Sequence, residues 1–277
     1  MSGLLFRLHR AGRRAREIFA AHRAGGPRCG ACGFAGRPQR RDLLWPSLIE
    51  EWALTPQWAD WMNQREGWRC VRCGANLRCG QLAGAIVQFV AARHGGQARS
   101  LREWVRTPIG RALDIAEINL AGNLHRHLAR CPGLRHSEYG SRDPKVPSED
   151  LSRLSYADAS FDLVITADTL EHVPDIDQAL RETLRVLRPG GAHVFSVPVI
   201  WDRPTRQRAL IRDGELVHLL PPSHHGAAGE NKGDFLVFNE FGADFPERCT
   251  AAGFSLQLLK DDNNPALVTF TAVRPQA

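Results

Sequence analysis

Two short cysteine motifs lie near the N-terminus. Cys29-Gly-Ala-Cys32 and Cys70-Val-Arg-Cys73 are each followed directly by a glycine. A C-x-x-C turn directs two thiolates at one metal ion, and the glycine permits a tight backbone whose amides hydrogen-bond to sulfur. Two such turns supply the four tetrahedral ligands of zinc, so we predict a structural Zn(2+) site. Four thiolates leave no open coordination position, so this ion would stabilise the fold and take no part in catalysis.

The chain has seven cysteines, and its N-terminus lacks the uninterrupted apolar core of a secretory signal. Metal ligation is therefore favoured over a disulfide framework. No apolar run approaches the roughly 20 residues that cross a bilayer, so we predict no transmembrane segment and expect a cytoplasmic protein.

Residues 1–26 form a basic amphipathic tail. Apolar residues recur at helical spacing through 4–22, and Gly25, Gly26 and Pro27 then end the pattern. Residues 1–41 carry ten arginines and a single acid, although arginine is used in place of lysine throughout the chain. The tail could dock a partner or contact nucleic acid or a membrane, and the alternatives are a solvated helix and a mitochondrial targeting peptide.

Residues 27–98 form one module around the two cysteine pairs. Five tryptophans lie between the pairs, Thr55-Pro56 is typical of a helix start, and residues 77–93 form an apolar helix ended by two glycines. We expect this Trp-rich module to pack on the domain that follows. A protein partner on its exposed indoles is the alternative.

Residues 105–277 alternate strands and helices. Apolar runs at 112–117, 134–139, 161–167 and 193–199 predict buried strands, and residues 175–191 predict an amphipathic helix with a capping pair at its start. This alternation indicates an α/β fold with a parallel sheet covered on both faces. Residues 254–273 close the chain with an antiparallel hairpin.

The segment 154–199 resembles the class I S-adenosylmethionine-dependent methyltransferases, particularly the type 11 branch. It reads LSYADASFDLVITADTLEHVPDIDQALRETLRVLRPGGAHVFSVPV. The match to the family pattern of strand, Leu-Glu-His-Val, helix and Leu-Arg-Pro-Gly-Gly is almost residue for residue. The resemblance covers about residues 111–273. It implies a Rossmann-like, seven-stranded methyltransferase sheet, mostly parallel with a C-terminal antiparallel hairpin, and S-adenosylmethionine as the cosubstrate.

The resemblance also implies a set of site residues. Glu138, which closes the second strand, takes the place of the acid that binds both ribose hydroxyls, and Asp150 with Leu151 takes the place of the adenine contacts. Asp168 follows the fourth strand, where the family turns toward the methionine moiety and the substrate. Glu171-His172 starts the next helix, as a structural or a chemical pair.

The segment 221–242 would cover the substrate in this fold. Its polar candidates are His224, His225, Asn239 and Glu240, and His225-Gly226 matches a dipeptide that such proteins carry there. A histidine with a near-neutral pKa can take a proton from a hydroxyl or amine. We predict His225, with His172 and Asp168, as the catalytic residues. The alternative for His225 is a hydrogen-bonded loop histidine.

The first loop departs from the glycine-rich pattern of the family. With Glu117 as the strand-end acid, Asn119, Ala121 and Asn123 fill the glycine positions beside Gly122. Asparagine tolerates positive φ and alanine is small, so this register can accept the cofactor. A second register would place Ile118 and Leu120 there and close the site. A minority of type 11-like proteins shares the zinc knuckle, the glycine-poor loop that begins with Glu, and "SEY" after the second strand.

Three functions follow from this sequence. The first is a methyltransferase that moves the methyl group of S-adenosylmethionine to a small molecule or glycan. The second is a degenerate methyltransferase fold that serves as a scaffold. The third is an RNA methyltransferase, which the mildly acidic body of the chain and the lack of an Asn-Pro-Pro-Tyr-like tetrapeptide disfavour.

Overall fold

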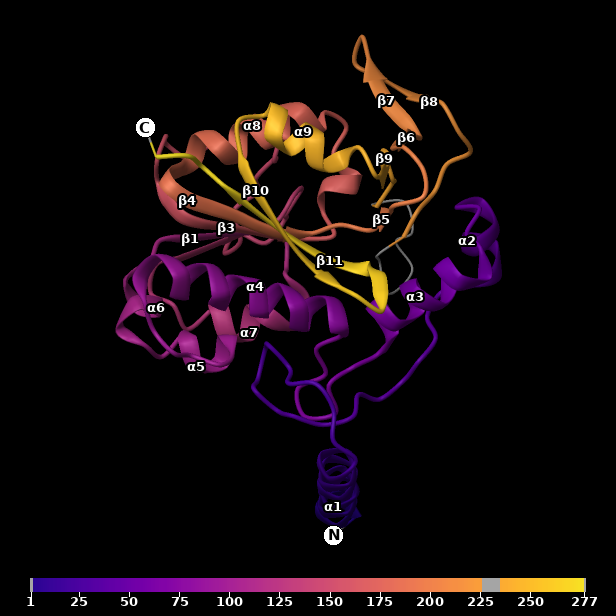
Figure 1. The fold of residues 1–277 in the computed structure, drawn as a ribbon, viewed down its shortest axis with the longest axis vertical. Coiled ribbons are helices and arrows are strands. Elements are labelled where there is room, and N and C mark those ends of the chain that lie inside the picture. Colours follow the sequence, from indigo (N-terminus) through magenta and orange to yellow (C-terminus); the bar gives the residue numbers. More distant parts are fainter. Residues whose placement is uncertain (1, 226–234, 277) are drawn as a thin grey trace.

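The computed structural model describes residues 2–225 and 235–276. Its centre is a six-stranded sheet in the order β10-β11-β4-β3-β1-β2 (Figure 1). β1 to β4 pair in parallel, and β10 and β11 form the antiparallel hairpin beside β4, as predicted. The strands are β1 Ile115–Ile118, β2 Leu134–Ser137, β3 Phe161–Ala167, β4 Leu187–Ser196, β10 Ser255–Asp261 and β11 Asn264–Val273.

The prediction of seven strands in this sheet is wrong, because the described residues supply six. The described residues between β2 and β3 contribute no strand to this sheet, and residues 149–154 among them form a turn. The Asp150 carboxylate accepts a hydrogen bond from the Ser152 amide at 2.8 Å, and the Glu149 carboxylate accepts one from the Ser155 amide at 2.8 Å. Such local side-chain bonds satisfy the backbone in place of a neighbouring strand.

Two helices cover one face of the sheet. α8 (Ile176–Val186) begins at Asp175, whose carboxylate accepts a hydrogen bond from the Gln178 amide at 2.9 Å, as the capping pair predicts. α9 (Phe245–Ala251) lies beside it in Figure 1. Apolar side chains of both helices and of β3, β4 and β11 form one buried core.

The opposite face is covered by helices from both sides of the predicted domain boundary. α4 (Leu77–His94), predicted as part of the zinc module, contacts β4 and β11. It is joined by α5 (Leu101–Trp104), α6 (Pro108–Ala112), the short 3-10 helix η1 (Gly122–Leu124) and α7 (His125–Leu128). One buried core includes Cys73 and Leu82 of the module together with Leu163 and Val194 of the sheet.

The Trp-rich segment packs on the second half of the chain, as expected. It contains α2 (Pro46–Glu51) and α3 (Pro56–Gly67), and Thr55 caps α3. Trp52, Trp58 and Met62 form a third core with Ile200 and Val237. The buried indoles donate to polar partners across this contact, Trp58 Nε1 to Asp202 at 2.6 Å and Trp52 Nε1 to Ser223 at 2.9 Å. Trp45 remains half exposed.

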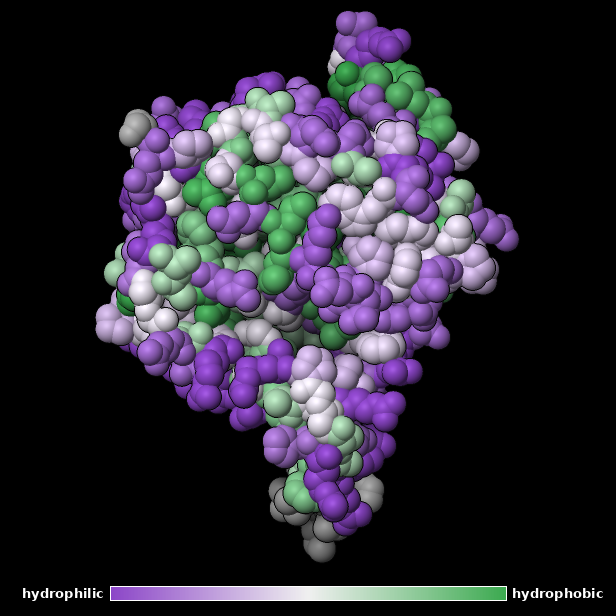
Figure 2. Space-filling model, viewed as in Figure 1, coloured by the Kyte–Doolittle hydropathy of each residue, from purple (hydrophilic) through white to green (hydrophobic). Residues whose placement is uncertain are grey.

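The segment after β4 adds small strands at one end of the sheet. β5 (Val199–Ile200), β9 (Asn239–Gly242) and β6 (Arg206–Gln207) pair with one another. β7 (Ala209–Arg212) and β8 (Glu215–His218) form a projecting hairpin, which is green in Figure 2 because it exposes Ile211 and Leu216. None of the helices within the described residues has the length and apolar character needed to cross a membrane.

The basic tail folds as helix α1 (Ser2–Arg23), which projects from the body (Figure 1). Its last turns touch the cysteine module. Ile18 packs on the first core, and His22 Nδ1 lies 2.9 Å from the Ala35 carbonyl oxygen. The Arg37 amide donates to the Ala21 carbonyl oxygen at 3.0 Å.

Candidate functional site

The four predicted zinc ligands meet in one cluster. The Sγ atoms of Cys29 and Cys73 lie 3.7 Å apart, as do those of Cys32 and Cys70. A tetrahedral zinc ion with Zn–S distances near 2.3 Å separates its sulfur atoms by about 3.8 Å, so the spacing fits. The four ligand atoms lie within 4.8 Å of one another, so the cluster can hold a metal ion.

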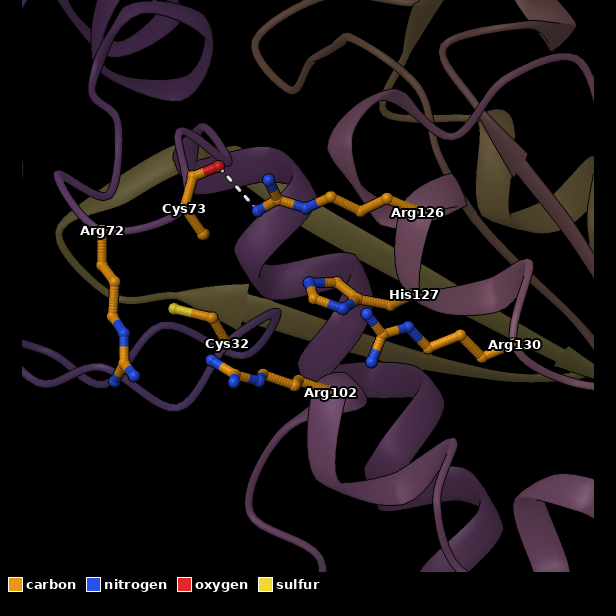
Figure 3. Close-up of a pocket in the computed structure, with 7 residues that line it drawn as sticks. All are labelled: Cys32, Arg72, Cys73, Arg102, Arg126, His127 and Arg130. Atoms are coloured by element: carbon orange, nitrogen blue, oxygen red, sulfur yellow. Dashed lines mark hydrogen bonds between the residues drawn. The ribbon is translucent and has the colours of Figure 1, made fainter. Parts of the chain in front are cut away.

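Arginines surround one side of this cluster. A cavity of about 290 Å³ is lined by Cys32 and Cys73, by His127, and by Arg72, Arg102, Arg126 and Arg130 (Figure 3). Arg126 donates to the Cys73 carbonyl oxygen at 2.7 Å. Burial first, and then the neighbouring arginines, lower the pKa of His127 to about 4, so this imidazole is neutral near pH 7. The arginines would offset the net charge of −2 that zinc with four thiolates carries.

The loop after β1 folds back onto its own acid. Glu117 is fully buried, and its carboxylate accepts hydrogen bonds from the Ala121 amide at 3.0 Å and from His125 Nδ1 at 2.5 Å. His136 Nδ1, from β2, lies 3.6 Å from the same carboxylate. Gly122 has a φ of 55°, and a Cβ atom there would lie 3.0 Å from the Cys79 sulfur of α4.

Asn119 adopts the positive φ that this loop requires. Its φ is 58°, and its side-chain oxygen accepts a hydrogen bond from the Tyr139 amide at 2.9 Å, which ties the loop to the end of β2. Ile118 is buried in the core that faces α8. The Leu120 side chain is 48% exposed, so it points away from that core.

The acid at the end of β2 keeps free hydrogen-bonding capacity. The side chain of Glu138 is 40% exposed, and its nearest ionisable partner is His136, with Nε2 at 3.3 Å from Oε1. Beyond β2, Asp150 and the buried Leu151 lie in the turn described above. Glu138 thus stands at the carboxyl edge of the sheet with a carboxylate that a ligand could reach.

Asp168, predicted as catalytic, is clamped between two arginines. Arg65 of α3, itself 1% exposed, donates two hydrogen bonds of 2.7 Å to its carboxylate, and Arg78 Nε of α4 lies at 3.0 Å. Ser196 Oγ donates a further bond at 2.9 Å. Burial alone would raise the pKa of Asp168, but the charges of Arg65 and Arg78 hold it well below its ordinary value. The carboxylate is ionised and fully engaged, so it is not placed to act as a base.

The structure brings the two predicted histidines together around a third residue. His172 Nε2 and His225 Nε2 lie 3.8 Å and 3.7 Å from Glu171 Oε1, respectively. Glu171 and His172 belong to the short 3-10 helix η2 (Leu170–His172), which follows β3. His172 Nδ1 lies 3.0 Å from the Leu236 carbonyl oxygen, and burial lowers the pKa of this imidazole. Both carboxylate oxygens of buried Glu171 lack a hydrogen-bond partner among the described residues.

The other candidates of the segment 221–242 have structural neighbours. Asn239 donates to the Val173 carbonyl oxygen at 3.1 Å, and buried Glu240 is paired with Arg203, Arg206 and Arg208. Gly226 lies outside the described residues.

Sequence reasoning missed several residues that the fold places at these sites. Arg65 and Arg78 clamp Asp168, and His125 and His136 flank Glu117. Arg65 and Asp168 are 103 positions apart, and no local pattern links them. Glu171, by contrast, was visible beside His172 in the Leu-Glu-His-Val motif.

Comparison with known proteins agrees with this architecture. Residues 112–195 match the family described as "Methyltransferase domain". A dimethylglycine N-methyltransferase of Parasynechococcus marenigrum is 31% identical over 157 residues, which cover 54% of this chain and 51% of that protein. A sarcosine/dimethylglycine N-methyltransferase of Halorhodospira halochloris is 48% identical over 115 residues, 42% of this chain and 38% of that protein. The chain spans about half or less of the length of these curated relatives.

Among solved structures, the chain is similar to the 1,6-didemethyltoxoflavin-N1-methyltransferase of Burkholderia thailandensis. The sequences are 16% identical, the likeness covers 86% of this chain and 94% of that one, and the TM-score is 0.43. Residues 112–195 thus match the methyltransferase domain family, and they contain the parallel strands β1 to β4 of an α/β sheet.

Proposed function

We propose that the chain is an S-adenosylmethionine-dependent methyltransferase with a small-molecule acceptor. The observation that carries this proposal is the accessible Glu138 carboxylate at the carboxyl end of β2, next to the loop that ends β1. In the sheet order β4-β3-β1-β2, the connection after β1 leads outward to β2, and the connection after β3 leads in the opposite direction to β4. Ligands of open α/β sheets bind in the crevice at such a switch point.

The residues around this edge suit a nucleoside ligand. The two oxygens of Glu138 can accept hydrogen bonds from both ribose hydroxyls, and Asp150 with Leu151 is the proposed adenine contact. Glu117 has a different role, because its oxygens already hold Ala121 and His125. It fixes the loop, and through the loop the position of Asn119 and Gly122.

Methyl transfer needs little chemistry from the protein. The sulfonium already activates the methyl group, so alignment of donor and acceptor supplies most of the rate. Asp168 would contribute by holding α3 and α4 against the end of β3 through Arg65 and Arg78. The cluster of His172, His225 and Glu171 is the proposed contact for the acceptor, since it follows β3 directly.

The class of acceptor is supported by the relatives. The two proteins quoted above are named for methylating dimethylglycine and sarcosine, which are small amines. We extend a small-molecule acceptor to this chain, with a nitrogen or oxygen nucleophile. We also propose that the cysteine cluster holds one structural Zn(2+) ion, since its sulfur spacing fits that ion.

Glu138→Ala tests this proposal directly. Charge-assisted hydrogen bonds are worth about 1.5–3 kcal/mol each. Losing the pair should weaken S-adenosylhomocysteine binding at least about tenfold, the equivalent of ~1.4 kcal/mol. Asp150→Ala should cost less, because one contact is lost. Titration calorimetry with the three proteins measures both effects, and Glu215→Ala, on the projecting β7–β8 hairpin, is the control.

Two results would contradict the proposal. Equal binding by wild type and Glu138→Ala would show that this carboxylate is not the ribose contact. No binding by wild type at millimolar ligand would favour the scaffold function, in which the loop that folds onto Glu117 has closed the site.

A further inference from the structure

We propose that Glu171, His172 and His225 bind a divalent transition-metal cation, at a site separate from the cysteine cluster. The ligand atoms of these three residues lie within 4.8 Å of one another. Tetrahedral coordination at about 2.1 Å separates ligand atoms by about 3.4 Å. The observed distances of 3.7 and 3.8 Å from Glu171 to the two imidazoles differ from this by a few tenths of an ångström.

The Glu171 carboxylate requires a positive partner. Its side chain is 0% exposed, and neither oxygen accepts a hydrogen bond from any described residue. A buried carboxylate without a partner is strongly destabilising, so such groups are paired, protonated or bound to metal. No arginine or lysine of the described residues lies within ion-pair distance of it, and the only basic side chains there are His172 and His225.

The His172 imidazole is oriented as a metal ligand would be. His172 Nδ1 faces the Leu236 carbonyl oxygen at 3.0 Å, so this nitrogen carries the proton and Nε2 keeps its lone pair toward Glu171. A backbone carbonyl that accepts a hydrogen bond from the other ring nitrogen is a usual partner of a metal-bound histidine.

The rest of the cluster is held rigidly. The Trp52 ring packs edge-on against His225 with centroids 5.2 Å apart, and the Trp52 indole is fixed by Ser223. The Glu171 carbonyl oxygen accepts the Phe238 amide at 2.8 Å. Three segments far apart in the sequence thus position the site before a cation arrives, which reduces the cost of ordering on binding.

The ligand set favours a particular class of ion. Two imidazoles and one carboxylate suit zinc, cobalt, manganese or iron(II). The four thiolates of the cysteine cluster are softer ligands and favour softer metal ions. Three protein ligands leave open positions for an oxygen or nitrogen of a bound molecule. In the proposed reaction such an ion would bind the acceptor and lower the pKa of its nucleophile. This last role rests on the proposed function, whereas the site itself does not.

Cobalt(II) distinguishes the two metal sites by their spectra. Full-length protein is first loaded with zinc in the cysteine cluster, and CoCl2 is then added without cosubstrate or acceptor. We expect one Co(2+) per chain, with visible d–d absorption and without the thiolate-to-cobalt charge-transfer band that cysteine ligation would give. Removing a group that hydrogen-bonds to a metal ligand costs about 10–100-fold in metal affinity. Loss of a ligand in Glu171→Gln or His225→Ala should therefore cost about 100-fold or more.

The controls separate metal binding from folding. His218→Ala, at an exposed histidine of β8, should bind cobalt as wild type does. Without metal, Glu171→Gln should melt at or above the wild-type temperature, because the amide replaces an unpaired buried charge. The proposal is overturned if wild type binds no cobalt at millimolar concentration, or if Glu171→Gln binds it equally well. A lower melting temperature for metal-free Glu171→Gln would also overturn it, since it would show a carboxylate paired within the protein. Failure of S-adenosylhomocysteine to bind would leave this result unaffected.

Discussion

At the scale of single residues, the fold separates three carboxylates that the sequence presents alike. Glu138 is partly exposed and accessible to a ligand, Asp168 is clamped by Arg65 and Arg78, and Glu171 is buried without a hydrogen-bond partner among the described residues. Each follows the carboxyl end of a parallel strand, where α/β folds place their chemistry. The role of each carboxylate therefore depends on its neighbours and not on its position along the chain. Glu138 is accessible to a ligand, Asp168 stabilises the fold through two arginines, and Glu171 is the proposed ligand of a cation.

Arg65→Met should destabilise the protein strongly. Removing one partner of a buried ion pair costs about 3–5 kcal/mol, and Arg78 would compensate only in part. The pKa of Asp168 is lowered in the folded state, so its stabilisation is present above the ordinary carboxyl pKa of 3.8 and is lost as the pH falls. Urea unfolding should show the loss at pH 7, and acid unfolding should move to higher pH.

Arg13→Met is the matched control, because Arg13 has an exposed partner, Glu17, at 3.7 Å on α1. It should change the free energy of unfolding by less than about 1 kcal/mol. Equal effects of the two substitutions would argue that Arg65 contributes no more than a surface arginine.

At the scale of elements, the cysteine turns are packed against α4 with almost no space between backbones. A Cβ atom at Gly30 would lie 2.2 Å from the Gly80 carbonyl oxygen and 2.8 Å from the Gly84 amide nitrogen. The position of the cysteine cluster therefore depends on that of α4, which in turn packs on β4 and β11.

Removing zinc should therefore destabilise a larger part of the protein than the two cysteine turns alone. Metal analysis of protein prepared without chelators should find about one zinc per chain in the cysteine cluster, lost in Cys29→Ser. The substitution should also lower the melting temperature followed by far-UV circular dichroism, because α4 covers the sheet. Zinc-free protein with an unchanged melting temperature would contradict a structural role for the cluster.

The basic helix α1 should divide into a dispensable part and an anchoring part. Its buried contacts with the body, among the described residues, lie toward its C-terminal end, at Ile18, Ala21 and His22, whereas Arg14 makes one exposed hydrogen bond to the Arg72 carbonyl oxygen at 3.3 Å. Deleting residues 1–16 should leave the melting temperature unchanged within error, whereas deleting residues 1–24 should lower it. Differential scanning calorimetry compares the two truncations, and equal melting temperatures would show that the contacts of the last turns contribute nothing.

At the scale of the whole molecule, the cysteine module and the sheet share one core. Leu82 of α4 is fully buried together with Leu163 and Val194 of the sheet. A shared core couples the unfolding of both parts, so the chain should unfold in one transition rather than two.

Leu82→Ala tests this coupling. Truncation of a buried leucine costs about 2–5 kcal/mol, and here the loss should appear in the single transition of the whole chain. Tryptophan fluorescence, which reports the Trp-rich segment, and far-UV circular dichroism should give coincident urea curves for wild type and variant. Leu216→Ala, at a half-exposed leucine of β8, should leave both curves near wild type. Two separated transitions would show independent domains.

The sequence by itself determined the features that act over a few residues. Cysteine spacing predicted the thiol cluster, the Asp175 capping pair predicted the start of α8, and apolar runs with turn residues predicted β3 and the β10–β11 hairpin. Hydrogen bonds within one turn and hydrophobic periodicity depend on residues close in sequence, so they can be predicted from the sequence.

Tertiary structure decided the rest. It built the sheet from six strands of the described residues, paired Asp168 with Arg65 across 103 positions, and placed Glu171 between two histidines without a hydrogen-bond partner in the described part of the chain. These outcomes depend on which buried side chains come within about 4 Å of each other, because burial and neighbouring charge set whether a carboxylate is free, paired or in need of a cation. Sequence distance carries no information about that.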